Sequence, residues 1–232
     1  IVNQSGGVIS GTEGVTVQTS DISGGITNDG TITGTNYGIE VINSSDVLGG
    51  IVNSGTISGA TAIFASSSSI AGGITNTGTI NGTGGTAINL VNLGGAAPIN
   101  INGGRIIGDV IDDTPANGFS VVTVGGNFAT EGDFNVSDLT VTAGDTLTIS
   151  AGDTVTLNNM SASAGTISFE VNSTANFGTL VVGGGGLDLT GAIVTVSVGA
   201  GNIADGDELM VADGAAAIAG GPGGVLTSVS DN

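Results

Sequence analysis

The sequence of 232 residues contains no cysteine, no histidine and no tryptophan, and Arg105 is its only basic residue against 20 acids. The absence of cysteine excludes disulfides, thiolate metal sites and cysteine nucleophiles. The absence of histidine excludes a Ser-His-Asp triad. Because phosphate binding needs clustered Lys and Arg, the net charge of −19 argues against nucleic acid and against direct binding to anionic lipid.

Aromatic residues and proline are also scarce. Aromatics make up 3% of the chain and hydrophobic residues 39%, so the core must consist of Ile, Val, Leu and Ala. With 3 prolines, 45 glycines and no triplet period, the chain is not collagen. No segment reaches the roughly 18 apolar residues of a membrane-spanning helix. The start, IVNQSGGVIS, lacks the basic region of a signal peptide and lies inside a repeat, so we expect the chain to be a fragment.

One glycine-rich phrase recurs through the first half of the chain. Its copies begin at Ile1, Ile26, Ile51, Ile74 and Ile99, so the steps are 25, 25, 23 and 25 residues. Each copy contains short runs that alternate an aliphatic residue with a polar one, the period of a β-strand. Since no run keeps a helical period, the repeat predicts an all-β fold: a right-handed parallel β-helix of about 25 residues per coil.

Stacked coils would place equivalent residues above one another. The isoleucines of this repeat are expected to form a buried ladder, and its asparagines a hydrogen-bonded amide ladder at a turn. The glycine two residues after each asparagine is expected at a corner with positive φ. The isoleucines are Ile32, Ile57, Ile80 and Ile106, the asparagines are Asn28, Asn53 and Asn76, and the glycines are Gly30, Gly55 and Gly78.

After residue 118 the phrase disappears, but β-strand patterns continue. The strands become longer and richer in β-branched residues, and five of the six phenylalanines lie here, at 119, 128, 134, 169 and 177. Aromatic side chains bury more area than the aliphatic residues of the first half. The sequence therefore predicts two regions: regular β-helix repeats over 1–118, and C-terminal coils with a cap over 119–232.

The I-x-N-x-G-T-I repeats resemble passenger domains of autotransporters, the type V secretion systems of Gram-negative bacteria. The stretch FEVNSTANFGTLVVGGGGLDLTGAIVTVSV (169–198), followed by DGDELMVADG (205–214), resembles the passenger-associated repeat and autochaperone region of that family. The resemblance implies a location outside the cell or on its surface. It also implies an outer-membrane β-barrel translocator within the same precursor and possible contacts with host surfaces, matrix or other cells. It assigns no functional residue.

Some β-helix proteins cleave acidic polysaccharides, so we considered Arg105, Asp109, Asp112 and Asp113 as a catalytic group. We interpret Asp112-Asp113-Thr-Pro-Ala-Asn-Gly as a turn, because Asp precedes Pro and Gly closes the stretch. No His or Lys is present to act as a base or to bind an anionic sugar. Gly183–Gly186 is not followed by Lys-Ser/Thr, so we interpret it as a flexible turn and not a phosphate loop. Asp205–Glu208 is interpreted as an acidic turn, because most ligands of a Ca²⁺ loop are missing. We therefore expect no enzyme, no catalytic or metal site and no cofactor.

We interpret the acidic residues of the chain as a solvated surface that keeps a β protein soluble. The alternative is that they bind cations. Two classes of function remain open. The first is a surface stalk and adhesin whose C-terminal region nucleates folding during secretion. The second is a self-assembling surface-layer or filament subunit, and a polysaccharide-degrading enzyme is a distant third.

Overall fold

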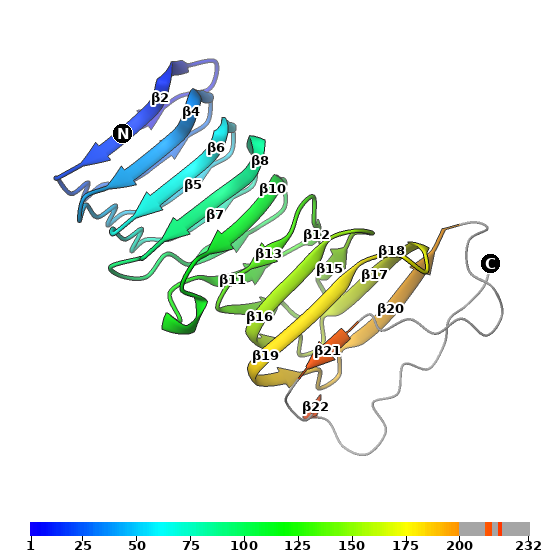
Figure 1. Cartoon of the computed structure of the whole chain (residues 1–232). Coiled ribbons are helices and arrows are strands. Elements are labelled where there is room, and N and C mark those ends of the chain that lie inside the picture. The colour runs from blue at the N-terminus through cyan, green and yellow to red at the C-terminus, as the bar shows by residue number, and fades with distance from the viewer. Residues whose placement is uncertain (200–211, 215–217, 220–232) are drawn as a thin grey trace.

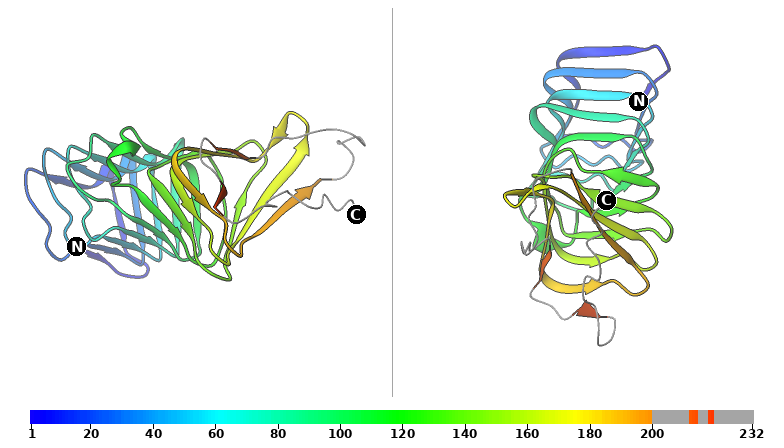
Figure 2. Two further views of the ribbon diagram at one scale, coloured as in Figure 1. Left: turned by 90° about the horizontal axis from the view of Figure 1, so that it is seen from below. Right: turned by 90° about the vertical axis from the view of Figure 1, so that its right-hand side faces the viewer.

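The computed structural model describes residues 1–199, 212–214 and 218–219. It confirms the predicted parallel β-helix: coils stack along one axis from the N-terminus toward the C-terminal end (Figures 1 and 2). Each of the first coils has one short and one long strand. The short strands are β1 (Val2–Asn3), β3 (Ile26–Asn28), β5 (Ile51–Asn53), β7 (Ile74–Asn76) and β9 (Ile99–Ile101). The long strands are β2 (Val8–Gln18), β4 (Thr31–Ile42), β6 (Thr56–Ser66), β8 (Thr79–Val91) and β10 (Arg105–Asp112).

The later coils are less regular. Among the described residues, the only helical element is a short 3-10 turn, η1 (Pro115–Asn117), which precedes them. Their strands are β11 (Val121–Val124), β12 (Asn127–Ala129), β13 (Phe134–Asn135), β14 (Asp138–Val141), β15 (Thr146–Ile149), β16 (Thr154–Ser161), β17 (Thr166–Ser173), β18 (Asn176–Phe177), β19 (Thr179–Asp188), β20 (Ile193–Val198), β21 (Ala212–Gly214) and β22 (Ile218–Ala219).

Equivalent residues of successive coils pair in parallel register. Ile26 pairs with Ile51, and Ile51 pairs with Ile74. Stacked asparagines are 25, 25 and 23 residues apart in sequence, as the repeat predicts. Later the offset changes, because Ser120 and Ser137 are only 17 residues apart. The coil therefore shortens after η1, although the stack continues.

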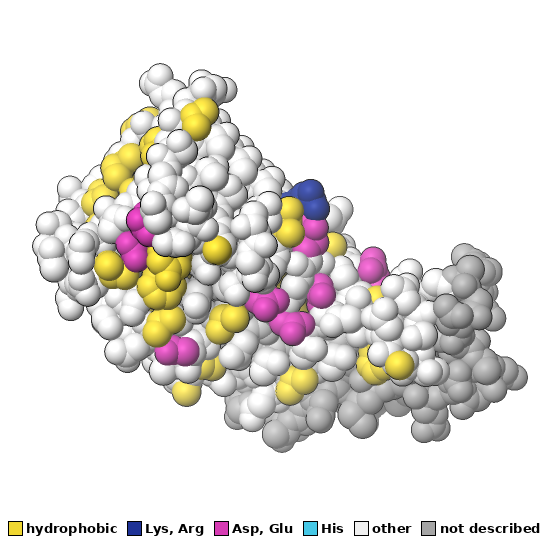
Figure 3. Space-filling view, turned by 45° about the horizontal axis from the view of Figure 1, so that its top comes forward, with side chains coloured by type: hydrophobic (Ala, Val, Ile, Leu, Met, Phe, Trp, Pro, Cys, Tyr) yellow, Lys and Arg dark blue, Asp and Glu magenta, His cyan; other side chains and the backbone are white. Residues whose placement is uncertain are grey.

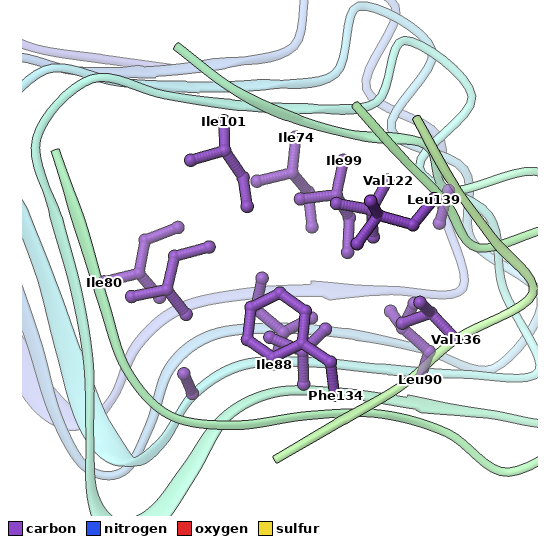
Figure 4. Close-up of a cluster of buried hydrophobic side chains, with 14 of the residues drawn as sticks. Ile74, Ile80, Ile88, Leu90, Ile99, Ile101, Val122, Phe134, Val136 and Leu139 are labelled. Atoms are coloured by element: carbon purple, nitrogen blue, oxygen red, sulfur yellow. The ribbon is translucent and has the colours of Figure 1, made fainter. Parts of the chain in front are cut away.

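The predicted isoleucine ladder is confirmed. Ile32 pairs with Ile57, Ile57 with Ile80, and Ile80 with Ile106, and each of these side chains is fully buried. Figure 4 shows Ile80 within a group of aliphatic residues and one phenylalanine that fill the interior between the coil walls. One hydrophobic cluster runs from Val15 to Leu187, so the core is continuous across residue 118. The division into regions 1–118 and 119–232 stays a prediction.

The predicted asparagine ladder is also confirmed. The Nδ2 atoms of Asn3, Asn28 and Asn53 each donate to the Oδ1 atom of the asparagine in the next coil, at 2.8 Å. Nδ2 of Asn53 also donates to the carbonyl oxygens of Gly55 and Thr79. The next position in the row is Ile101, which ends the ladder. These bonds compensate for the burial of polar amides, because each amide finds partners within its own coil and the next one.

The expected role of the repeat glycines is wrong. Gly30, Gly55 and Gly78 are not among the residues with positive φ; the left-handed glycines are instead the second ones of the Gly-Gly pairs, such as Gly25 (φ 72°) and Gly50 (φ 74°). A Cβ atom on Gly55 would collide with the carbonyl oxygen of Gly30 in the preceding coil. Glycine is required here because two backbones approach closely.

The last coils diverge from the regular stack. A second sheet contains β12, β15, β17, β18 and β20, and β18 folds back on β17 as the one antiparallel pairing of the described strands. In Figure 1 this part extends away from the N-terminal coils at the right. No residue of β20 is fully buried, and Ile193 is 60% exposed.

We expect Ile57→Ala to lower the free energy of unfolding by about 2–5 kcal/mol, because it leaves a cavity between two coils. Urea denaturation followed by circular dichroism would measure the loss. Ile193→Ala is the matched control, since that side chain is mostly exposed and should cost far less. Equal losses for the two variants would contradict the assigned ladder.

Within the amide ladder, we expect Asn53→Ala to cost more stability than Asn76→Ala. Either change removes one of the three acceptors of the preceding asparagine. Asn53→Ala also removes the ladder donor of the Asn76 Oδ1 atom, whereas no asparagine follows Asn76 in the row. A buried polar atom left without a partner costs about 1–3 kcal/mol. Urea midpoints of the two variants provide the comparison, and the reverse order would show that the amides do not act as a chain.

Candidate functional site

The residues considered for catalysis do not converge on one surface. Arg105 is exposed at the start of β10 and forms an ion pair with Glu131 in the next coil. Its Nε atom donates to Oε1 of Glu131 at 2.7 Å, and its Nη2 atom donates to Oε2. The hydrogen bond and charge of Glu131 raise the pKa of Arg105 further above its usual value. The single base of the chain therefore links two coils.

Two of the candidate carboxylates cap backbone groups of neighbouring coils. Oδ1 of Asp109 accepts a hydrogen bond from the backbone N–H of Asp133 at 2.9 Å. Oδ1 of Asp113 accepts one from the backbone N–H of Asn92 at 2.7 Å. Both bonds cross from one coil to another, so these two carboxylates have a structural role in the stack.

Asp112 is the exception, because its side chain points into the rod and is fully buried. It pairs with Leu90 and so occupies a position of the apolar core. Its Oδ2 atom accepts a hydrogen bond from Oγ of Ser120 at 2.6 Å, and its Oδ1 atom accepts one from the backbone N–H of Thr114 at 2.8 Å. Donors on both oxygens offset the cost of removing the carboxylate from water.

A serine pair extends this buried polar cluster to the next coil. The Oγ atoms of Ser120 and Ser137 are 2.9 Å apart, and each serine N–H donates to the other hydroxyl oxygen. The loop between Asp112 and Ser120 is held from outside as well, since Nδ2 of Asn158 donates to the carbonyl oxygen of Pro115 at 2.8 Å. The cluster lies where the coil shortens, and it closes the η1 loop onto the rod.

The chemistry of this cluster is limited by its burial. Asp112 could in principle accept a proton from the Ser120 hydroxyl, but both side chains are fully buried. A general base must come within hydrogen-bonding reach of the substrate proton. The geometry therefore supports a clamp inside the fold. The sequence does not reveal this cluster, because Asp-Asp-Thr-Pro also indicates an exposed turn and nothing in the pattern marks Ser120 and Ser137 as partners.

Several surface carboxylates also accept hydrogen bonds across coils. Oδ1 of Asp21 accepts from the backbone N–H of Asp46 at 2.9 Å, and Oδ1 of Asp133 accepts from that of Thr154 at 2.6 Å. The same arrangement continues with side-chain donors. The further pairs are Asp29 with Ser54, Asp46 with Ser69 and Asp138 with Asn159. The interpretation of the acids as only a solvated surface is therefore incomplete. The 25-residue spacing of Asp21 and Asp46 in the sequence indicates that they lie in neighbouring coils.

Two glycine-rich or acidic segments remain from the sequence analysis. Gly183–Gly186 is not a turn, because these residues lie within β19, and the expectation of a flexible turn is wrong. The glycines continue the strand, whose pairing with β16 contains an irregularity between Leu157 and Asn159. Asp205–Glu208 lies outside the described residues.

Comparison of the chain with protein-family models, curated proteins and solved structures finds no match. Within the described part of the chain, no group of three or more His, Cys, Asp or Glu residues is placed to hold a metal ion. No helix among these residues is long and apolar enough to cross a membrane. The site that the structure itself defines is the buried polar cluster around Asp112.

We expect Asp112→Ala to lower the free energy of unfolding by about 1–3 kcal/mol, because the Ser120 hydroxyl and the Thr114 N–H lose their acceptor. Hydrogen exchange should also become faster at the amide of Thr114. Asp113→Ala is the control, since Asp113 and its donor Asn92 are both exposed and water can replace the carboxylate at the Asn92 N–H. A similar loss from both variants would contradict the special role of the buried carboxylate.

Proposed function

We propose that this chain is part of a surface-exposed β-helical passenger of the autotransporter type, which acts as a stalk and an adhesin. The observation that carries the proposal is the continuous stack of coils around one core, from Val15 to Leu187. Such a stack holds its outer faces in a fixed array along an extended rod. Asp109 and Asp113 accept hydrogen bonds from neighbouring coils and Asp112 is buried, which favours a structural role over catalysis.

We further propose that residues 119–232 nucleate folding and that the N-terminal coils assemble on them. The buried aromatic residues support this order, since Phe128, Phe134 and Phe169 all lie in the core of the later coils. The rings of Phe128 and Phe134 are 5.8 Å apart in a tilted arrangement. Aromatic pairs add stability beyond the area that they bury.

The alternative function is a self-assembling surface-layer or filament subunit. The near-identical coils support it, because Ile26, Ile51 and Ile74 stack in one parallel register. A coil of one copy could stack on a coil of another copy in the same way. Electron microscopy of the purified chain separates the two functions, because a filament subunit would form long regular fibres and a stalk would remain as single rods.

Antibody labelling of intact Gram-negative cells that make the full precursor tests the proposed location. We expect the antibody to detect this chain on intact cells without permeabilisation. A cytoplasmic protein serves as the control for lysis. Detection only after the cells are opened would overturn the proposed passenger function.

For the folding order, we expect residues 119–232 expressed alone to unfold cooperatively in urea. We expect residues 1–118 alone to be unfolded or aggregated, because their coils lack the aromatic core on which they would assemble. Circular dichroism and light scattering of both fragments provide the measurement. Independent folding of 1–118 together with an unfolded 119–232 fragment would reverse the proposed order.

A further inference from the structure

Five apolar side chains stand on the outer face of the long strands of coils two to five, where polar residues would be expected. All five are partly exposed; Phe64 and Ile111 lie between buried neighbours, and Ile42 and Val91 each follow a buried residue. We call this set the apolar strip. It consists of Tyr37 and Ile42 on β4, Phe64 on β6, Val91 on β8 and Ile111 on β10.

Strand register places four members of the apolar strip in two neighbouring outer rows. Phe64 and Ile111 belong to one outer row, with Asn89 between them. Ile42 and Val91 belong to the next outer row of the same face. From coil to coil these four residues alternate between the two rows, and Tyr37 lies in a third row, between Glu13 and Thr61. An aromatic pair marks its N-terminal part, because the rings of Tyr37 and Phe64 stack with centroids 4.8 Å apart and planes at 18°.

Carboxylates border the apolar strip. Glu13 is the strand partner of Tyr37, and Glu40 is the strand partner of Phe64. Glu40 makes no hydrogen bond or ion pair within the described part of the chain. The only base, Arg105, is already paired with Glu131. In Figure 3 hydrophobic and acidic side chains adjoin each other on the N-terminal coils. Arg105 therefore supplies no counter-charge to Glu13 or Glu40, and this face remains complementary to a cationic partner.

We propose that the apolar strip and its bordering carboxylates bind a cationic amphipathic segment of another protein, with Lys or Arg alternating with aliphatic residues. This inference rests on the adhesive part of the proposed function and names its partner class. Exposed apolar surface with a polar border is typical of protein-binding sites. The aliphatic stems of Lys and Arg can cover the strip while their charged ends reach Glu13 and Glu40. Tyr and Phe rings also attract cations.

A fluorescent amphipathic peptide of leucine and lysine tests the proposal against the whole chain by anisotropy. We expect saturable binding that weakens as salt is added, and no binding of a matched peptide with glutamate in place of lysine. Phe64→Thr should weaken binding at least about tenfold, as for a central aromatic residue of an interface. Since Thr16 and Thr156 occupy the same outer row, threonine suits the strand at this position.

Two control variants separate the strip from general attraction to an acidic protein. Ile193→Thr removes an exposed aliphatic residue elsewhere. Asp145→Asn removes one charge from a carboxylate that makes no side-chain hydrogen bond to the described residues. We expect both to bind the peptide like the parent chain, whereas Glu40→Gln should reduce the salt dependence. Equal effects of Glu40→Gln and Asp145→Asn, or unchanged binding by Phe64→Thr, would overturn the proposal. Failure of surface labelling would instead overturn the passenger function and leave this binding result intact.

Discussion

The backbone of each coil hydrogen-bonds to the coils on both sides, so residues at one position of the repeat lie directly above one another. This stacking decides which side chains each position can hold. Isoleucine packs on isoleucine along the row of Ile57, and each asparagine amide donates to the next one along the row of Asn53. A substitution in such a row acts on two neighbours, because the altered residue is part of the environment of both.

The same stacking explains how a chain with 20 acids and one base forms a compact rod. Hydrogen bonds to carboxylates are stronger than those between neutral groups. Asp21 and Asp133 each accept the backbone N–H of the following coil, while Asp112 satisfies donors inside the rod. The acids therefore contribute attraction between coils as well as repulsion at the surface.

The fold could be predicted because period and alternation act locally: a step of about 25 residues with aliphatic residues at fixed places leaves few arrangements besides stacked coils. The predicted positive φ of Gly55 was wrong. Glycine is required both where φ is positive and where two backbones approach closely, and the sequence alone does not distinguish these two reasons. The burial of Asp112 could not be predicted from the sequence, because the direction of its side chain depends on the η1 loop and on the shorter coil that follows. The apolar strip was missed because Phe64 and Ile42 resemble core residues until strand register shows which way each one points.

The bonds between coils also determine how the rod responds to mechanical force. These bonds run along the axis of the rod. A pull on the two ends therefore loads all coil interfaces in series with the same force. The weakest interface would then open first, and a freed coil of about 25 residues extends to roughly 80 Å from a rise of about 4.8 Å. In the proposed stalk, the rod would lengthen in steps under shear while its remaining coils stay folded.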